Sequence, residues 1–256
     1  MVKYSDYKFK SVYKFLDIVY NSVENDVVFW NFDRNRFVNG SLKFCKDSLL
    51  HLYVSNTLYN HYEKLFYEEG DAVDIETQSW WINLLKEYNF ELTDESFDED
   101  DDAFPSKWFA KNNEVFGCFF EYVADELVHI LFNDKQFLVR FNLMIRNIVK
   151  DEEGEYINIL NWPNGSRNEN GTIPRCIIPM WVKRAVYHRD KGHCVFCNCD
   201  LTGLVNILRQ ENYDHIVPLK DYGVNDPSNI QLTCEECNKK KGAREVLPKY
   251  KYQSWW

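Results

Sequence analysis

Apolar side chains recur at helical spacing through most of the first 160 residues. In residues 41–70, leucine, tyrosine and phenylalanine return every three or four positions, which is the spacing of one face of an α-helix. Ser41 can cap the start of such a helix and Gly70 can end it. The same pattern occurs in three later segments, 74–90, 114–132 and 135–149. We therefore predict a mostly helical N-terminal region.

The pattern changes near residue 170. Residues 161–174 are rich in asparagine, glycine and proline, which suits a linker or a long loop. Residues 178–190 predict one more helix with its apolar side chains facing inward. Its basic side chains would face water or a ligand; these are Lys183, Arg184, His188 and Arg189. We place a domain boundary near residue 170, between a domain in 1–170 and a domain in 171–256.

The charge balance changes sign at the same boundary. The chain carries a formal net charge of −10. Residues 1–170 hold 17 Lys and Arg against 31 Asp and Glu, a net of −14, whereas residues 171–256 hold 13 against 9, a net of +4. DNA responds to the local field, so the C-terminal part can attract it. The acidic run 93–104 predicts a solvated loop, and an alternative interpretation is a mimic of a phosphate backbone that shields the basic part.

The composition is typical of a soluble globular protein. Hydrophobic residues make up 45% of the chain and aromatic residues 16%, enough for a buried core. No apolar run is long enough to cross a bilayer. The first twenty residues mix lysines and acids with apolar residues, unlike a signal peptide. We therefore expect a cytoplasmic protein without membrane contact.

Two Cys-x-x-Cys pairs flank a compact segment in the C-terminal part. Cys194 and Cys197 form the first pair, and Cys234 and Cys237 form the second. Four thiolates at this spacing suit a closed tetrahedral zinc site, which holds structure and leaves no open position for catalysis. In a cytoplasmic chain such pairs indicate a metal before disulfides, and the alternatives are a redox pair or four free thiols. Cys199 is a third thiol in CVFCNC and could displace one of the four ligands.

The segment between the pairs predicts a strand, a loop, a returning segment and a short helix. NYDHIVPL has the β-branched residues of a strand. KDYGVNDPSN has strong turn chemistry, and CEECNKKKG predicts a short helix closed by Gly242. Zinc would hold the two ends together, because a segment of this size does not fold reliably without such a staple.

Polar side chains in this segment supply the groups that phosphodiester hydrolysis needs. Asp214 and Asn238 offer hard oxygen ligands suited to Mg²⁺. His215 can take a proton from water, because the ordinary pKa of histidine lies near neutral pH. Asp214 and His215 are neighbours, so on a regular strand they would point to opposite faces, and a twist at the strand end could bring both to one site. Basic side chains that can hold phosphates are Lys239, Lys240, Lys241, Arg184 and Arg189.

The sequence RDKGHCVFC, followed by DHIVPL and SNIQLTCEECNKKKG, closely resembles the HNH endonuclease family. The resemblance covers about residues 178–245 and implies the ββα-metal fold. The whole chain would then be an α+β protein, with a mostly helical N-terminal domain followed by a small zinc-stapled nuclease domain.

By this resemblance, His215 would be the general base and Asn229 would orient it. Asp214 and Asn238 would bind the catalytic Mg²⁺ or Mn²⁺. The third letter of the family name stands for a histidine, and this chain has Asn238 there. This asparagine in place of histidine resembles the replacement in the HNH domains of RNA-guided effector nucleases. An asparagine oxygen can still bind Mg²⁺.

Two functions follow from these residues. The first is a metal-dependent DNA endonuclease that acts as the effector of a bacterial defence or restriction system. The N-terminal helical domain of the protein would then dock a protein partner or self-associate. The second is a zinc-stapled module that binds nucleic acid without cutting it. Such a module needs the cysteines and lysines but has no use for Asp214, His215 and Asn238 together. The sequence does not distinguish DNA from RNA as the substrate.

Overall fold

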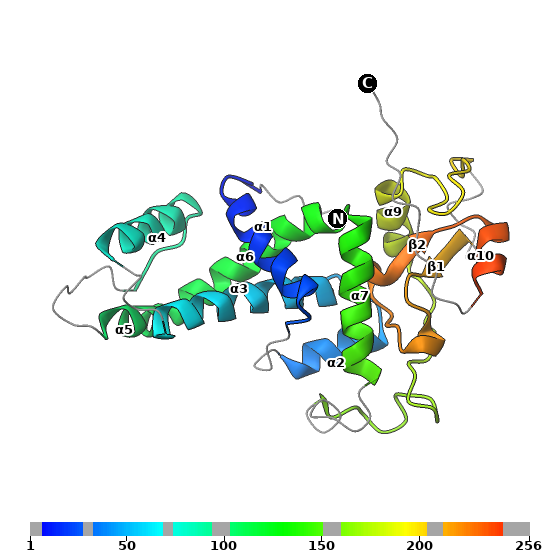
Figure 1. Cartoon of the computed structure of the whole chain (residues 1–256), viewed down its shortest axis with the longest axis horizontal. Helices are drawn as coiled ribbons and strands as arrows, with labels where there is room; N and C mark the ends of the chain where they lie inside the picture. Colours follow the sequence, from blue (N-terminus) through cyan, green and yellow to red (C-terminus); the bar gives the residue numbers. More distant parts are fainter. Residues whose placement is uncertain are drawn as a thin grey trace. The chain divides into compact units, whose positions relative to one another are not determined.

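A computed structural model of the chain describes residues 7–27, 33–68, 74–93, 103–150, 160–203 and 212–242 (Figure 1). The backbone forms two compact units. The first comprises Met1–Phe32 and His51–Val128, and the second comprises Asp33–Leu50 and His129–Trp256. Among the described helices, none combines the length and the apolar character that a membrane crossing needs.

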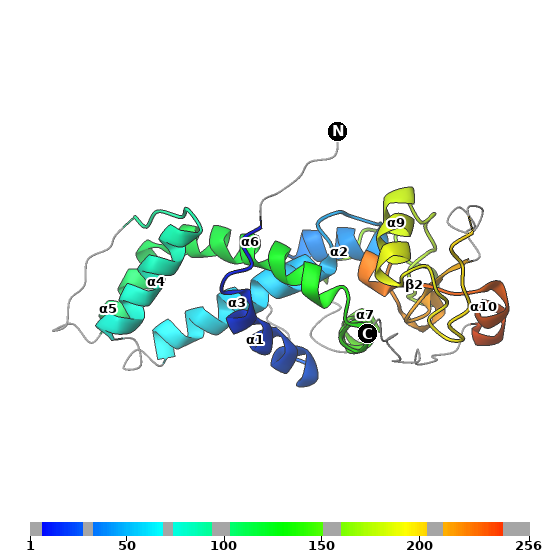
Figure 2. The same cartoon turned by 90° about the horizontal axis from the view of Figure 1, so that it is seen from above.

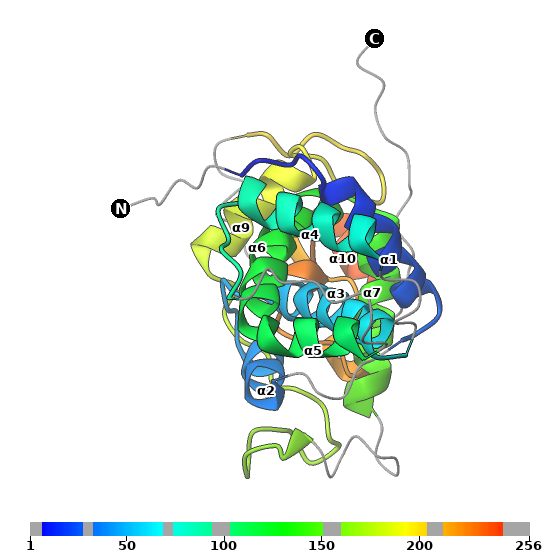
Figure 3. The same cartoon turned by 90° about the vertical axis from the view of Figure 1, so that its left-hand side faces the viewer.

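Helices make up the regular structure described in the first unit. They are α1 (Val12–Glu24), most of α3 (Leu49–Glu68), α4 (Ile75–Glu87), α5 (Phe104–Lys111) and most of α6 (Asn113–Leu131). Figure 3 shows α1, α4, α5 and α6 arranged around α3. Residues 94–102 of the acidic run lie outside the described residues, so its interpretation stays a prediction.

Aromatic rings fill the core of the first unit. Phe66 of α3 lies 4.9 to 6.4 Å, between ring centroids, from four neighbours on α4, α5 and α6: Trp81, Trp108, Phe109 and Phe116. Each of these five side chains is at most 1% exposed. Aromatic pairs at such distances contribute about 0.5–1.5 kcal/mol each beyond the burial of their surface. The high aromatic content of the sequence therefore serves largely to hold these helices together.

The second unit combines helices with one two-stranded sheet in its described part. Its elements are α2 (Arg34–Leu42), α7 (Lys135–Lys150), α9 (Met180–Arg189), β1 (Tyr213–His215), β2 (Ile230–Leu232), α10 (Glu235–Lys241) and two 3₁₀ turns, η4 (Leu219–Asp221) and η5 (Pro227–Asn229). The strands are antiparallel, and Asp214 lies opposite Gln231. Figures 1 and 2 show the sheet between α9 and α10.

An apolar core joins α9 to the sheet. It consists of Ile178, Val182, Val186, Cys194, Leu201, Tyr213, Ile230 and Leu232. Two hydrogen bonds reinforce it: Arg189 donates to the Ile230 carbonyl at 2.6 Å, and the Leu232 N–H donates to the Asp190 carboxylate at 2.9 Å. These contacts align β2 with the C-terminal end of α9.

The structure confirms the predicted α+β fold class and most of the predicted elements. The helices predicted in 74–90, 114–132, 135–149 and 178–190 are α4, α6, α7 and α9. NYDHIVPL contains β1, the returning segment contains β2, and CEECNKKKG contains α10. Gly242 ends α10 with a left-handed backbone, φ 55°, which glycine adopts without strain.

The helix predicted in residues 41–70 is in fact two helices. Ser41 does not start a helix, because it lies in the last turn of α2, where its hydroxyl donates to a carbonyl one turn earlier. The second helix, α3, begins at Leu49, whose N–H donates to the carboxylate of Asp226 at 2.8 Å. One hydrogen-bond acceptor at the start of α3 thus comes from a distant part of the chain. Gly70 lies outside the described residues.

The boundary predicted near residue 170 falls inside the second compact unit, which contains residues on both sides of it. Residues 161–174 form a loop without helix or strand, as predicted. The division into a helical domain in 1–170 and a nuclease domain in 171–256 stays a prediction.

Candidate nuclease site and zinc centre

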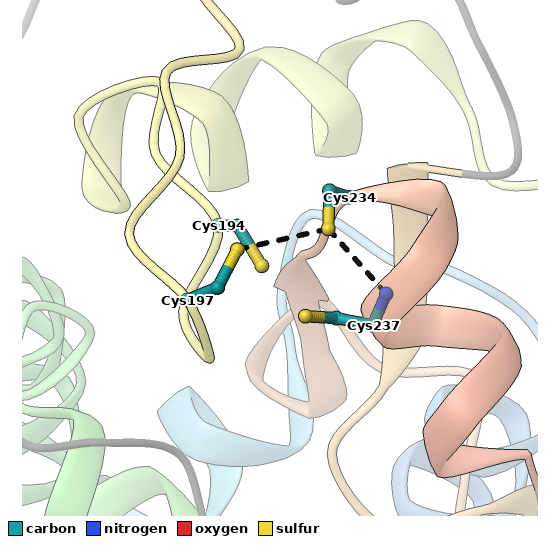
Figure 4. A group of neighbouring side chains, drawn as sticks. All are labelled: Cys194, Cys197, Cys234 and Cys237. Carbon is teal, nitrogen blue, oxygen red and sulfur yellow. Dashed lines mark hydrogen bonds between the residues drawn. The ribbon is translucent and has the colours of Figure 1, made fainter.

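Four thiols meet where the two Cys-x-x-Cys pairs approach each other (Figure 4). The Sγ atoms of Cys194, Cys197, Cys234 and Cys237 all lie within 4.8 Å of one another, and those of Cys197 and Cys234 are 3.7 Å apart. Zinc with Zn–S bonds of about 2.3 Å places its sulfurs roughly 3.8 Å apart in a tetrahedron. The thiols therefore fit the structural zinc that the sequence predicts. Cys199 is exposed and is not one of these four thiols, although its own thiol interacts with those of Cys197 and Cys234.

Backbone turns hold both cysteine pairs in place. In the first pair, Asn198 adopts a left-handed backbone, φ 61°, and donates its N–H to the Cys194 carbonyl at 2.8 Å. The N–H of Val195 donates to a carbonyl of β2 at 3.0 Å. In the second pair, Cys234 precedes α10 and its sulfur accepts the N–H of Cys237 (Figure 4). The four-thiol cluster therefore joins the loop after α9 to the start of α10.

A cavity of about 460 Å³ lies beside the sheet. Asp214 and His215 of β1 and Asn238 of α10 line it together. β1 is three residues long and ends at His215, so the two neighbouring side chains lie at a strand end, where twist can bring both to one site. Asn229 does not line this cavity.

A buried lysine holds the carboxylate of Asp214. Lys241 Nζ lies 2.7 Å from Asp214 Oδ2 and 2.7 Å from the carbonyl oxygen of His215, and its side chain is 1% exposed. Gln231 donates to the same Oδ2 at 3.3 Å. The prediction that Lys241 contacts phosphate is therefore wrong for this structure. Lys241 follows Asn238 by three residues, so the helical period turns it inward.

The imidazole of His215 is buried and neutral. Its burial lowers the pKa to about 3, and the charges of Arg175 and Lys241 act in the same direction. The nearby Asn225 side chain opposes this shift. Neither ring nitrogen completes a hydrogen bond of good geometry with a described residue. Buried nitrogens without partners are rare and need a functional explanation.

The four thiols and the cavity residues Asp214, His215 and Asn238 lie in one stretch of the chain. Residues 194–244 match the family model for HNH endonuclease. We refer to this stretch as the HNH segment. It contains both cysteine pairs as well as Asp214, His215 and Asn238, and the match includes no residue before 194. No curated protein and no solved structure gave a match.

Asn229 supports the HNH segment from within. Its side chain is fully buried, donates to the carbonyls of Val217 and Val224 at 3.1 and 3.0 Å, and accepts the N–H of Val217 at 2.8 Å. These bonds hold the chain that directly follows His215. The family resemblance implies that Asn229 orients the histidine. In the structure these bonds reach the backbone after His215 and not its ring.

Sequence reasoning missed two buried polar side chains in the loop before β2. Asn225 donates to the Leu42 carbonyl at 3.0 Å and to the Pro174 carbonyl at 2.9 Å, which ties the HNH segment to residues outside it. Asp226 accepts the N–H of Leu49, and burial raises its pKa to about 6. The turn residues of KDYGVNDPSN mark a loop. They carry no signal for the partners of that loop.

Three of the residues predicted to bind nucleic acid are exposed. Arg184 lies on the exposed side of α9, and Lys239 and Lys240 lie on the exposed side of α10. The two lysines pair with Glu235 and Glu236 at 2.5 and 2.6 Å. These glutamates partly offset the positive charge, so the basic run presents a weaker cationic surface than its sequence indicates.

Arg189 was also expected to face water or nucleic acid, and the structure corrects this. Its side chain is buried, and its guanidinium donates to the Asp190 carboxylate at 2.8 and 3.0 Å. The same group lies 4.9 Å over the ring of Phe132. Lys183, on the same helix, is buried as well, with Nζ 5.5 Å over the ring of Tyr213. Both cations therefore belong to the interior of the second unit.

Proposed function

We propose that this protein is a metal-dependent endonuclease that hydrolyses phosphodiester bonds in DNA. The observation that carries the proposal is the cavity in which Asp214, His215 and Asn238 lie together within the HNH segment. A module that only binds nucleic acid needs the zinc site and surface cations. It gains nothing from a buried neutral histidine beside a carboxylate and an amide oxygen.

The oxygen atoms at the cavity fit a divalent metal ion. Lys241 and Gln231 both donate to Oδ2 of Asp214, and no described residue donates to Oδ1. Oδ1 of Asp214 and the side-chain oxygen of Asn238 would hold Mg²⁺ or Mn²⁺, which prefer such ligands. A metal ion held there would supply positive charge to stabilise the phosphate and the leaving 3′ oxygen.

His215 would accept the proton of the attacking water. Its neutral ring has a lone pair that can take this proton. Lys241 bonds both to the Asp214 carboxylate and to the His215 carbonyl, so it holds the two neighbouring residues in one orientation. The water oxygen forms a bond to phosphorus as the bond to the 3′ oxygen breaks, and the 3′ oxygen then takes up a proton.

The test is cleavage of supercoiled plasmid with Mg²⁺, with Mn²⁺ or with EDTA. We expect metal-dependent nicking by the wild type, and a rate at least about 100-fold lower for His215→Ala, which is the scale of general-base catalysis. The matched control is His188→Ala, an exposed histidine of α9, which should retain the wild-type rate. Equal rates for His215→Ala and the wild type would overturn the assignment. DNA binding without cleavage in any divalent metal would favour the binding module.

We also propose that the nuclease serves bacterial defence or restriction, held by a protein partner or by a second copy through its helical N-terminal part. The physical reason is that a nuclease of loose specificity needs restraint in its own cell. Fewer phage plaques on cells that carry the wild type than on cells that carry His215→Ala would support this role. Recovery from its native host only as an unbound monomer would count against a dedicated partner.

A further inference from the structure

Part of the wall of the nuclease cavity comes from outside the HNH segment. Asn168, Thr172 and Arg175 line it from the loop before α9. Lys220 of η4 lines it from within the HNH segment. The family match begins at residue 194, so it does not describe the contribution of this loop.

The loop that carries Arg175 is held by its own hydrogen bonds. The Asn168 N–H donates to the Thr172 carbonyl at 2.8 Å, and the Asn168 side chain donates to the Thr172 hydroxyl at 3.0 Å. Gly171 donates to the Asn168 carbonyl with φ 76°, a backbone that glycine adopts without strain. Arg167 donates to the Val149 carbonyl at the end of α7. This wall of the cavity is therefore an ordered structure.

Asn225 holds the backbone on both sides of Arg175. Its Nδ2 donates to the Pro174 carbonyl at 2.9 Å, and its Oδ1 accepts the N–H of Cys176 at 3.4 Å. Asn225 is fully buried, whereas Arg175 is exposed. The backbone of Arg175 is thus positioned while its guanidinium remains accessible at the cavity, close enough for its charge to act on His215.

Arg175 and Lys220 differ from the other cations near the site. Within the described ranges neither forms an ion pair, whereas Lys239 and Lys240 pair with glutamates and Lys241 pairs with Asp214. Accessible cations without an acidic partner, at the edge of a cavity that also holds the candidate metal ligands, suit an anionic ligand.

We propose that Arg175 and Lys220 form a binding site for the phosphates of the nucleic-acid strand that is cut, beside the position of the scissile phosphate at Asp214 and Asn238. This proposal rests on the proposed nuclease function. Arg175 supplies a planar fork of donors that matches two phosphate oxygens, and Lys220 supplies a point charge. Neither residue contributes base recognition, so binding through them is independent of sequence.

The experiment measures binding of a fluorescent DNA duplex by anisotropy at several salt concentrations, with the full chain carrying His215→Ala so that the DNA stays intact. Adding Arg175→Gln should lower the affinity about tenfold, because a lost charged hydrogen bond has this scale. It should also reduce the slope of log affinity against log salt by about one. Arg175→Lys should retain part of the affinity. The matched control is Arg34→Gln, which removes an exposed arginine of α2 that does not line the cavity.

A second arm separates this proposal from the proposed function. Plasmid cleavage is measured for the wild type, Arg175→Gln and Lys220→Gln without the His215 change. Cleavage that falls in both variants, with the smaller salt slope, supports the phosphate site. The phosphate site is overturned, and the nuclease assignment stands, if the wild type cleaves while Arg175→Gln matches Arg34→Gln in affinity and salt slope and matches the wild type in cleavage rate. An inactive wild type overturns the nuclease, and the salt slope still decides whether Arg175 contacts phosphate.

Discussion

Three consecutive lysines on α10 occupy different environments. Lys239 and Lys240 are exposed, whereas Lys241 is buried against Asp214. Helical spacing explains the difference, because Lys241 follows Cys237 by four positions and Asn238 by three, and those residues face the zinc site and the cavity. The sequence contains this signal, but the appearance of a uniform basic run conceals it.

The buried ion pair between Lys241 and Asp214 leads to a prediction about stability. Lys241→Met keeps most of the side-chain volume but removes the charge that Asp214 faces. We expect the free energy of unfolding to fall by about 3 kcal/mol, because breaking a buried pair leaves an uncompensated charge. Urea unfolding of the zinc-loaded protein measures this change.

The control for that prediction is Lys240→Met on the exposed face of the same helix. Its ion pair with Glu236 lies at the surface, so the free energy of unfolding should change by less than about 1 kcal/mol. If Lys241→Met were as stable as Lys240→Met, the role given to Lys241 would be contradicted.

Among the helices, the start of α3 shows why the sequence pattern did not predict one helix boundary. The apolar spacing in residues 41–70 is continuous enough to predict one helix. The actual start at Leu49 is capped by Asp226, which lies 177 positions away along the chain. An acceptor supplied from so far along the chain leaves no local pattern, so only the folded structure reveals that contact.

Asp226 also gives a pH prediction. Its pKa is raised to about 6 by burial, with a smaller contribution from Asp47. An acid with a raised pKa binds its proton more tightly in the folded state than in the unfolded state. Its contribution to stability is therefore fully present below about pH 4 and is lost as the pH rises through 6.

The measurement compares the wild type with Asp226→Asn, which cannot ionise. Between pH 4 and pH 7 the free energy of unfolding of the wild type, relative to Asp226→Asn, should fall by about 2–3 kcal/mol. The constant cost of losing one acceptor in Asp226→Asn cancels in this comparison. A difference that does not change with pH would show that Asp226 has an ordinary pKa.

In the molecule as a whole, the sequence predicts the residues within the candidate site better than the distant residues that hold them in place. The zinc thiols, Asp214, His215 and Asn238 follow from motifs within about fifty residues. The sequence does not single out Arg175, because the loop that contains it carries no motif of catalytic or metal-binding residues. Its placement depends on Asn225, which also bonds to Leu42 across 183 positions. Contacts of that range have no signature in a single sequence.

Those supports predict that the HNH segment depends on residues before 170. Asn142 of α7 donates to the Ser228 carbonyl at 3.1 Å, and Asn225 and Asp226 bond to residues 42 and 49. A fragment of residues 171–256 loses all of these contacts. A domain of this size is only marginally stable, so the loss should be measurable. We expect its β1 and β2 amides to exchange with solvent at least about tenfold faster than those of the full chain.

The matched comparison for that experiment is a fragment of residues 129–256, which retains α7 and therefore the contact of Asn142. Its β1 and β2 amides should exchange at an intermediate rate. If the 171–256 fragment were protected as well as the full chain, the packing around the HNH segment would be unnecessary for its fold.

Asp214 and Asn238 are proposed to hold the metal ion of a nuclease beside its general base, His215. Anomalous X-ray diffraction of Mn²⁺ in crystals of the full chain carrying His215→Ala tests this most directly. We expect one manganese peak in the cavity, bounded by Asp214 and Asn238, which disappears in Asp214→Ala. A peak that persists in Asp214→Ala, or manganese bound only outside this cavity, would contradict it.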